Sequence, residues 1–434
     1  MIEQIVFVVV LIVAIYLISR RIRCIRQNIN IGKPGAPVEH FTSRIRNVLL
    51  IAFGQKKMFK RPVPALLHLC VYLGFLIINL EVLEFVLDGL TGTHRMFAPH
   101  LGEFYAVAMN VFEVLALAVL LACVVFLVRR NITKLPRFWS AEMTQWPRMD
   151  ANIILVSEIV LMLAILTMNA ADQKLQLLDA EHYPSTGSLI ISSGLIPLLG
   201  GIEKEGLVLI ERFCWWFHIL GILAFAVYIT YSKHLHIALA FPYTYFSSIE
   251  PAGKIQNMPA ITNEVKIMLG LASEGGAPSE QGRFGARDIN DLPRTSLLAA
   301  YACTECGRCT SECPANLTGK KLSPRKIMMD VRDRMEEVGR IRDSGGDGLR
   351  DGSLLDTYIT REEINACTSC NACVEACPVL LNPLSIILEL KRYVVMEESA
   401  APQSWNSMFQ NIETNFAPWK FAPTERFKWS EKTD

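Results

Sequence analysis

The 434-residue sequence predicts an all-α protein, in which a bundle of five transmembrane helices is followed by a second, mainly helical domain. Two observations support this. Residues 1–240 contain five long apolar stretches and all eight histidines. Residues 241–434 contain no histidine, carry helix-capping signals, and hold eight of the twelve cysteines in two runs of identical spacing. The two halves therefore differ in material and in chemistry.

The five apolar stretches are each close to the length of ~20 residues that a helix needs to cross the hydrocarbon layer. The first is not a signal peptide, because Met1-Ile-Glu-Gln lacks a basic n-region. A sixth apolar segment, Leu189 to Leu199, is too short to cross and predicts a re-entrant or surface helix. The predicted spans are residues 4–19, 62–87, 104–128, 152–170 and 207–231.

Basic residues predict the orientation, because loops on the cytoplasmic side carry an excess of lysine and arginine. The loop between the first two spans is rich in both, and Arg129 and Arg130 follow the third span. The other loops, 88–103 and 171–206, carry only Arg95, Lys174 and Lys204. We therefore expect a multi-pass protein of a bacterial or archaeal cytoplasmic membrane, with its N-terminus outside and all residues after 232 inside.

The chain divides into three parts on these grounds: a membrane domain (1–240), a linker (241–295) and a cytoplasmic domain with a tail (296–434). A stretch rich in Gly, Ser and Ala, from Ala272 to Ala286, predicts a flexible loop in the linker. The formal net charge of +1 gives no indication of a nucleic-acid partner.

Two cysteine runs, each C-x₂-C-x₂-C-x₃-C-P, carry the most specific signal in the sequence. Thiolates suit iron–sulfur clusters, and in two-cluster ferredoxins the fourth cysteine of each run binds the other cluster. Zinc would favour two separated C-x₂-C pairs. We therefore predict two [4Fe–4S] clusters, one held by Cys303, Cys306, Cys309 and Cys377, the other by Cys367, Cys370, Cys373 and Cys313.

Helix signals surround these runs. Ser323-Pro324 predicts the start of a helix over Lys326 to Val338, because serine caps and proline fits the first turn. Thr360-x-x-Glu363 is a capping box before the second run, and Pro383 to Glu397 has an amphipathic pattern. Gly307 allows the backbone to approach a cluster closely.

Histidines are costly inside a membrane and are therefore functional candidates. His218 and His236 are eighteen residues apart, or five turns of a continuous helix, so they share one side, whereas His234 faces elsewhere. His68 lies near the cytoplasmic end of the second span, and two helices with imidazoles at matching depth can bind a haem iron from both sides. Interfacial histidines with ordinary hydrogen bonds are the alternative. Glu81 and Glu84 share a helix face and are candidates for proton relay to a quinone.

The segment Ser232-Lys233-His234-Leu235-His236 resembles the cytoplasmic end of the last helix in the nitrate reductase gamma subunit family. That resemblance implies five spans and two b haems, with ligands matching His218, His236 and His68. The family's second ligand on the second span falls on Ile78 here. The resemblance thus implies a haem b between His68 and His236. A second haem on His218 would need His94 or His100 as partner, or would be five-coordinate or absent.

The cysteine domain resembles the alpha-helical ferredoxin domain of succinate dehydrogenase iron–sulfur subunits and of heterodisulfide reductase. The segment Asn411 to Trp419 is similar to the one after the clusters in heterodisulfide reductase-type proteins. Nearly the whole chain resembles membrane-bound heterodisulfide reductase-like Fe–S oxidoreductases, whose relatives include electron-transfer-flavoprotein:menaquinone oxidoreductases. Such proteins continue into Cys-Cys-Gly repeats, and this sequence has neither adjacent cysteines nor a G-x-G-x-x-G fingerprint.

The resemblance implies a membrane electron-transfer subunit of a quinone-linked oxidoreductase, with no catalytic residue of its own. Electrons would pass between a cytoplasmic partner, the two clusters, haem b and menaquinone or another quinone. The expected partner is a Cys-Cys-Gly-type Fe–S subunit, an electron transfer flavoprotein, or both. The alternative is a membrane anchor and assembly platform for a cytoplasmic reductase, in which the clusters are structural.

Overall fold

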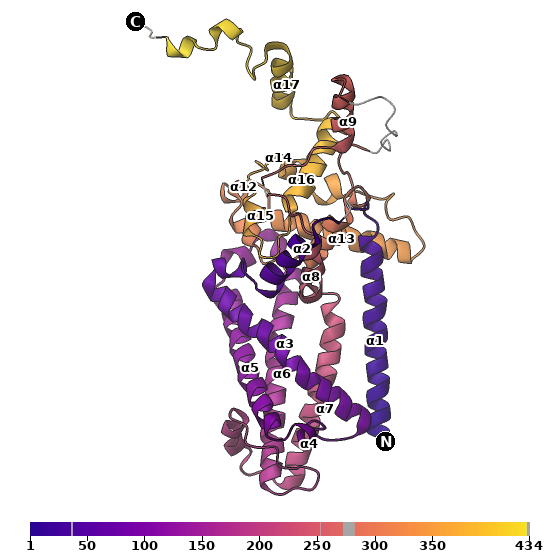
Figure 1. The fold of residues 1–434 in the computed structure, drawn as a ribbon, viewed down its shortest axis with the longest axis vertical. Coiled ribbons are helices and arrows are strands. Elements are labelled where there is room, and N and C mark those ends of the chain that lie inside the picture. Colours follow the sequence, from indigo (N-terminus) through magenta and orange to yellow (C-terminus); the bar gives the residue numbers. More distant parts are fainter. Residues whose placement is uncertain (36–37, 252, 272–282, 432–434) are drawn as a thin grey trace.

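The computed structural model describes residues 1–35, 38–251, 253–271 and 283–431. Within these ranges the chain folds into helices joined by turns, with two isolated β-bridges and no strand. Figure 1 shows long helices at one end of the molecule and a group of shorter helices at the other. We call the first group the helix bundle, and we call residues 283–400 the cysteine domain.

Five helices of 26 to 32 residues form the bundle, and all five are long and apolar enough to cross a membrane. Each contains most or all of a predicted span, so their number and order are confirmed. They extend beyond most of the predicted ends, because charged flanking residues such as Arg20 to Arg26 continue the helix past the apolar core. They are α1 (Ile2–Ile29), α3 (Pro62–Thr91), α5 (Glu103–Leu127, continued by a π-helical turn Val128–Ile132), α6 (Trp146–Leu177) and α7 (Lys204–Ile229).

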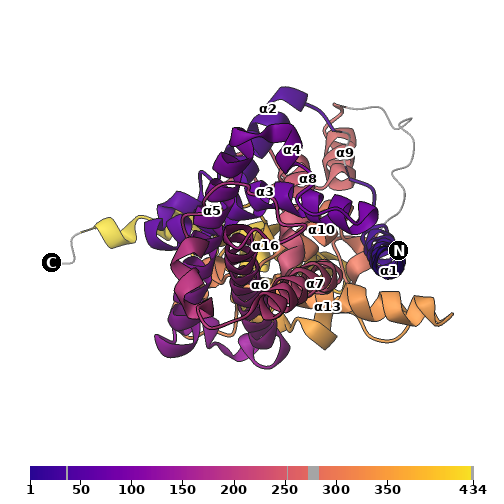
Figure 2. The ribbon, with the colours of Figure 1, turned by 90° about the horizontal axis from the view of Figure 1, so that it is seen from below.

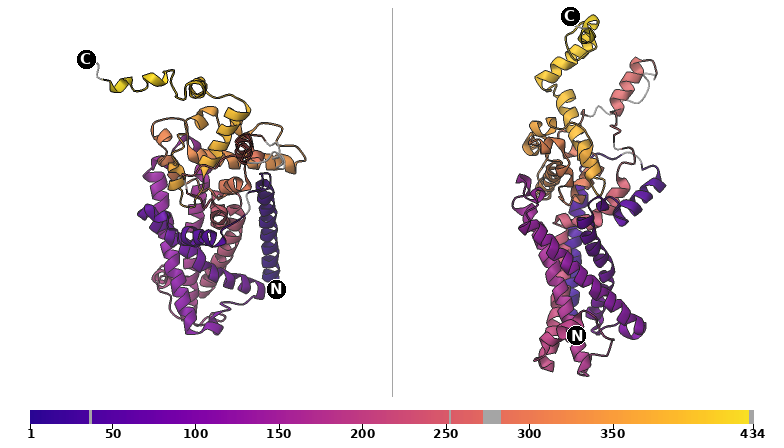
Figure 3. Two further views of the ribbon diagram at one scale, coloured as in Figure 1. Left: turned by 45° about the horizontal axis from the view of Figure 1, so that its top comes forward. Right: turned by 90° about the vertical axis from the view of Figure 1, so that its left-hand side faces the viewer.

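Five passes leave the N-terminus at the end of the bundle far from the cysteine domain (Figures 1 and 3). Viewed from below, α5, α6 and α7 lie near one another with α1 at the edge (Figure 2). The bundle core is apolar and includes Phe7, Phe85, Val119 and Trp215. Close approach is needed at Gly89, where an added Cβ would lie 2.7 Å from the Phe7 ring.

The inner end of α1 is part of the cysteine domain's packing. Arg21 Nη2 donates to Glu336 Oε1 at 2.6 Å, and Asn28 Nδ2 donates to the Tyr301 hydroxyl at 2.9 Å. Asn28 is completely buried. Farther along, the Lys33 backbone N–H donates to Leu292 O at 2.9 Å. The first helix therefore joins the two parts of the molecule.

The last long helix ends earlier than expected. α7 stops at Ile229, a turn follows, and a 3₁₀ turn Lys233–Leu235 leads into α8 (His236–Phe246). The prediction that His218 and His236 lie five turns apart on one continuous helix is therefore wrong. Ser232 causes the break: it has extended backbone and its hydroxyl accepts from the His234 N–H at 3.1 Å, which starts a new turn.

The shorter helices of the cysteine domain begin where the caps predicted. The Ser323 hydroxyl accepts from Lys326 N at the start of α13, and Thr360 and Glu363 form the expected capping box at α14. The amphipathic segment from Pro383 is α16 with a π-helical turn after it. The helices are α10 (Arg294–Ala302), α11 (Arg308–Ser311), α12 (Pro314–Leu317), α13 (Pro324–Asp343), α14 (Arg361–Asn365), α15 (Ala372–Ala376) and α16 (Pro383–Arg392).

The core of the cysteine domain starts before residue 296, because Ala286, Ile289 and Leu292 are fully buried in it. These residues lie at the end of the segment expected to be a linker. Most of the predicted Gly-rich loop, residues 272–282, lies outside the described residues. Other helices include α2 (Phe41–Asn47), a π-helical turn Val48–Phe53, α4 (Ala98–Leu101), α9 (Pro259–Met268) and α17 (Gln403–Asn415).

The apolar segment between α6 and α7 forms a short 3₁₀ helix, Ser192–Leu199. Eight residues of 3₁₀ helix are too few to cross a membrane, so the prediction that this segment is not a sixth crossing is confirmed. Glu113 on α5 holds its start: its carboxylate accepts from Ile191 N at 3.0 Å and from Ser192 N at 3.2 Å.

Candidate redox site

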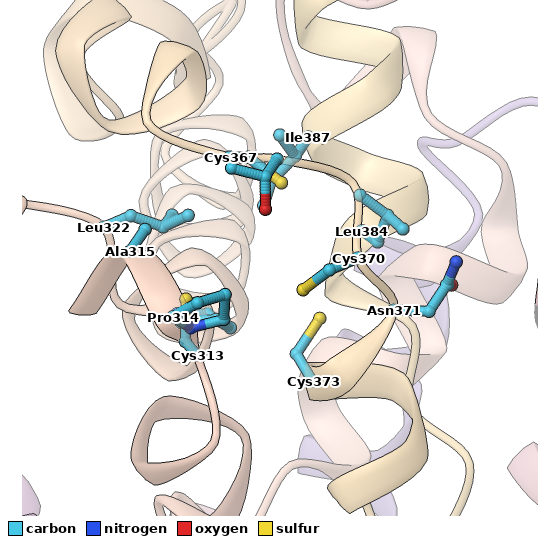
Figure 4. Close-up of a pocket in the computed structure, with 12 residues that line it drawn as sticks. Cys313, Pro314, Ala315, Leu322, Cys367, Cys370, Asn371, Cys373, Leu384 and Ile387 are labelled. Atoms are coloured by element: carbon cyan, nitrogen blue, oxygen red, sulfur yellow. The ribbon is translucent and has the colours of Figure 1, made fainter. Parts of the chain in front are cut away.

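Four of the eight cysteines surround one pocket in the cysteine domain. Cys367, Cys370 and Cys373 come from the second run, and Cys313 is the last cysteine of the first. Figure 4 shows Cys313 across the pocket from Cys370 and Cys373, with Cys367 on a third side. This is the arrangement that crossing of the fourth ligands requires.

The remaining four cysteines gather in the same way. Cys306 lies close enough to Cys377 to affect it, so burial and then the Cys306 thiolate raise the pKa of Cys377 to about 11. Burial, followed by Cys306, Cys303 and Cys377, raises the pKa of Cys309 well above its usual value. Buried thiols of this kind become thiolates only when a positive centre such as iron stabilises the charge. The last cysteine of the second run therefore joins the first three of the first run.

The spacing within each group fits a cluster better than a single ion. In the described part of the chain, no three His, Cys, Asp or Glu side chains converge closely enough to share one metal ion. In a [4Fe–4S] cubane each thiolate binds a different iron, so the four sulfurs stand apart around the cube. The chemistry of the donor set, four cysteines around a pocket, fits that group.

The two cysteine loops share one backbone conformation. Gly307 (φ +71°) and Asn371 (φ +61°) follow the second cysteine of their runs, and both adopt the left-handed region. Glu305 (φ +55°) and Ser369 (φ +56°) precede that cysteine and do the same. Glycine and asparagine tolerate this region best, which explains why these residue types stand there. The sequence predicted the role of Gly307 but not the matching role of Asn371.

The two groups differ in exposure. Cys370 is the one exposed thiol among the eight. In the first run, by contrast, Cys303, Glu305, Gly307 and Arg308 are buried. The loop before α3 covers this run: Arg61 Nη2 donates to Glu312 Oε1 at 2.7 Å, and Arg308 Nη1 lies 3.4 Å from Met58 O. The first group therefore faces the bundle and the second faces the surface.

His68 and His236 lie opposite each other where the bundle meets the cysteine domain. Their ring centroids are 6.4 Å apart. Two imidazoles bound to one metal would have centroids about 6 Å apart, from a metal–nitrogen bond of about 2 Å and about 1 Å from that nitrogen to the ring centre on each side. The two histidines thus fit an iron between them.

Both rings are oriented through their other nitrogen. His68 Nδ1 lies 3.1 Å from Gln55 Oε1, and His236 Nδ1 lies 3.3 Å from Lys233 O. Metal-bound histidines almost always donate this second N–H to an oxygen, which fixes the ring and leaves Nε2 for the metal. Gln55 is buried and was not found from the sequence, because a single glutamine in a loop forms no pattern.

The other histidines occupy different surroundings. His218 Nδ1 bonds to Leu161 O at 3.0 Å, and its ring lies 5.5 Å from that of Phe85. His94 Nε2 lies 3.2 Å from Asp172 Oδ1, and exposed His100 bonds to the Met96 carbonyl. Neither therefore has a hydrogen bond directed to His218. His234, expected to face elsewhere, has its ring 5.4 Å from that of His236 because the chain breaks between them and α7.

Glu81 and Glu84 are buried at the outer end of the bundle, around Arg95. Arg95 Nη1 lies 3.6 Å from Glu81 Oε1, and its Nη2 donates to Asn169 Oδ1 at 2.6 Å. Glu84 accepts from the Tyr105 hydroxyl at 2.7 Å. Glu81 Oε1 has no hydrogen-bond partner among the described residues, which is uncommon for a buried carboxylate.

Comparisons with known proteins agree with the cysteine chemistry. Residues 302–381 match the family model of the 4Fe-4S dicluster domain. The chain is 29% identical to the "Probable iron-sulfur-binding oxidoreductase FadF" of Bacillus subtilis, over 98% of this chain and 60% of that protein. It is 24% identical to the "EtfAB:quinone oxidoreductase" of Syntrophomonas wolfei, over 91% of this chain and 55% of that protein.

A shorter match, 30% identity over 35% of this chain and 25% of the relative, is to a "Probable membrane-anchored ferredoxin" of Chromohalobacter salexigens. The chain thus spans less than two thirds of the length of each of these relatives. No solved structure matches it significantly. Taken together, the cysteine geometry and the family match identify residues 302–381 as an iron–sulfur domain of the dicluster type.

Proposed function

We propose that the protein is a membrane electron-transfer subunit that relays electrons between a cytoplasmic redox partner and a membrane quinone. The observation that carries this proposal is the placement of two four-cysteine sites on the inner end of the bundle, one of them next to the paired His68 and His236. The clusters and a haem b would supply the one-electron steps when bound.

The chain's own residues give the relay an order. Cys370 is exposed, so the Cys313–Cys367–Cys370–Cys373 site is the one that a soluble partner can approach. The Cys303–Cys306–Cys309–Cys377 site is enclosed by the loop before α3, which also supplies Gln55 to His68. Electrons would thus pass between the surface, the buried cluster site and the histidine pair.

The partners and the quinone are part of this proposal. A relative named EtfAB:quinone oxidoreductase favours an electron transfer flavoprotein and a quinone. A match over 27% of this chain, 31% identical, to a CoB-CoM heterodisulfide reductase component of Methanosarcina acetivorans favours a Cys-Cys-Gly-type partner. The five long apolar helices favour a bacterial or archaeal inner membrane, with the cysteine domain in the cytoplasm. The buried Glu81 and Glu84 would take part in proton exchange at the outer end.

The test is a dithionite-reduced minus oxidised spectrum of the purified protein, with haem and iron quantified. We expect a b-type haem band and about eight non-haem irons per chain, as two [4Fe–4S] clusters require. The band should disappear in His68→Ala and His236→Ala. It should persist in His100→Ala, which removes an exposed histidine bonded only to a backbone carbonyl.

Each outcome has a clear meaning. A wild-type protein without a haem band would overturn the haem, and an iron content near four would overturn one of the cluster sites. Clusters that quinol or quinone cannot reduce or oxidise, in a protein that still assembles with its partner, would favour the role of a membrane anchor and assembly platform.

A further inference from the structure

Glu305 lies inside the first cysteine run, between Cys303 and Cys306, and its side chain is almost completely buried. One carboxylate oxygen accepts from Lys233 Nζ, and the other accepts from Arg332 Nη2 at 2.5 Å. Lys233 belongs to the segment after α7, and Arg332 to α13. A single carboxylate in a cluster loop therefore connects the bundle side to the cysteine domain.

Lys233 also contacts the histidine pair. Its carbonyl oxygen lies 3.3 Å from His236 Nδ1, so it accepts the hydrogen bond that orients that ring. Its backbone N–H donates to Asp150 Oδ2 at 3.1 Å, which holds the turn in place against the start of α6. A continuous path of covalent and hydrogen bonds thus runs from His236 through Lys233 and Glu305 to Cys306.

The four charged groups on this path balance. Lys233 and Arg332 are cationic, Asp150 and Glu305 are anionic, and Lys233, Asp150 and Glu305 are all less than one tenth exposed. In a poorly solvated interior, removing one of the four leaves an uncompensated charge that acts strongly on nearby centres. Added negative charge disfavours electron uptake at a neighbouring centre, and added positive charge favours it.

We propose that the Lys233–Glu305 pair is a positioning link between the first cluster site and the His68–His236 site, and that its charge balance sets the reduction potentials of both. The inference rests on the proposed function. It goes beyond it by naming residues that bind neither group directly but hold the two sites together through one ion pair.

The test measures the potentials of the first cluster and of the haem by redox titration with electron paramagnetic resonance and optical spectra. Lys233→Met removes a cation, so both potentials should shift downward. Glu305→Gln removes an anion, so both should shift upward. The double variant restores the balance and should return close to wild type, and Lys233→Arg should keep wild-type potentials.

The matched control is the ion pair between Arg21 and Glu336, which also joins the bundle to the cysteine domain, at 2.6 Å. Arg21→Met and Glu336→Gln should weaken that contact without moving the two potentials in opposite directions. Iron and haem content, measured on every variant, identifies any variant that fails to fold. Lys233→Arg and the double variant keep the test decisive if a single variant does.

Shifts of the same sign in Lys233→Met and Glu305→Gln, or no shift in either, would overturn the inference while the wild-type spectrum still supports the proposed function. A wild-type protein without haem or clusters would instead overturn the proposed function itself. The two failures are therefore distinguishable.

Discussion

Gly307 shows how closely the first cysteine loop depends on one residue. It adopts a left-handed φ of +71°, and an added Cβ would lie 2.5 Å from Arg325 Nη1 and 3.3 Å from Arg137 Cβ. Arg325 cannot easily move, because it is fully buried and donates to Glu142 Oε1 at 2.6 Å. The position therefore demands both the conformation and the size of glycine.

We expect Gly307→Ala to cost about 1–2 kcal/mol for the left-handed backbone, and more for the contact with Arg325. Gly319 is the control, since it has a φ of +81° but nothing within 4 Å of an added Cβ. Thermal unfolding and iron content check both variants. Gly307→Ala should lose more stability and more iron than Gly319→Ala, and equal losses would contradict the role of crowding.

Gln55 gives a second prediction at this scale. Its Oε1 orients His68, and loss of such a partner typically costs about 10–100-fold in metal affinity. Gln55→Leu should therefore bind haem about 10–100-fold more weakly, measured by haem titration of the protein freed of haem. Gln410→Leu, on the exposed face of α17, should leave haem affinity unchanged. Equal affinity in Gln55→Leu and wild type would contradict the role of Gln55.

Among the elements, α13 carries a buried carboxylate with a consequence for pH. Burial raises the pKa of Asp330 to about 7, although Lys326 Nζ lies 2.7 Å away and opposes the shift. The carboxyl is free to ionise at about pH 4 in the unfolded chain. Between about pH 4 and 7 the unfolded state therefore loses this proton first, so this contribution to stability is present at low pH and falls as pH rises.

Asp330→Asn removes the titrating group and keeps its shape. The melting temperature of the variant should consequently fall less than that of wild type between about pH 5 and pH 8. Melting curves of both proteins across this range, with clusters intact, provide the measurement. Parallel pH profiles would show that Asp330 keeps an ordinary pKa in the folded protein.

Local patterns predicted most of these elements, because apolar length and capping residues act within a few positions of the chain. The five long helices, the Ser323 and Thr360 caps and the α16 amphipathic segment follow from such signals. The break after α7 did not, since Ile229 to His236 contains nothing that rules out a helix. It depends on Asp150, which lies about eighty positions earlier and binds Ser232 Oγ at 2.6 Å.

The candidate site divides in the same way. Cysteine spacing predicted which thiols would be neighbours, including the exchange of Cys313 and Cys377 between the two groups. His68 and His236 were predicted as a pair, but the helical register used for His236 was wrong. Gln55, Lys233 and Glu305 could not be found from the sequence, because their roles arise only when the loop before α3 and the turn after α7 meet the cysteine domain.

At the scale of the whole molecule, five passes put the loop between α6 and α7 at the end opposite the cysteine domain (Figure 1). If the chain spans a membrane as proposed, these two regions lie on opposite sides. In intact spheroplasts, Glu181→Cys should react with a membrane-impermeant maleimide, whereas Ser248→Cys should react only after lysis. Both residues are exposed, and unmodified protein gives the background. The reverse pattern would invert the orientation.

The contacts at the inner end of α1 have a consequence for biosynthesis. Arg21, Asn28 and Lys33 leave the ribosome among the first residues of the chain, whereas their partners Glu336, Tyr301 and Leu292 follow more than 250 residues later. The polar groups of the first helix thus wait for a domain that is completed only when its cysteines have received their iron. A cell short of iron would make chains with this end unpaired, which quality-control proteases can recognise before any electron is transferred.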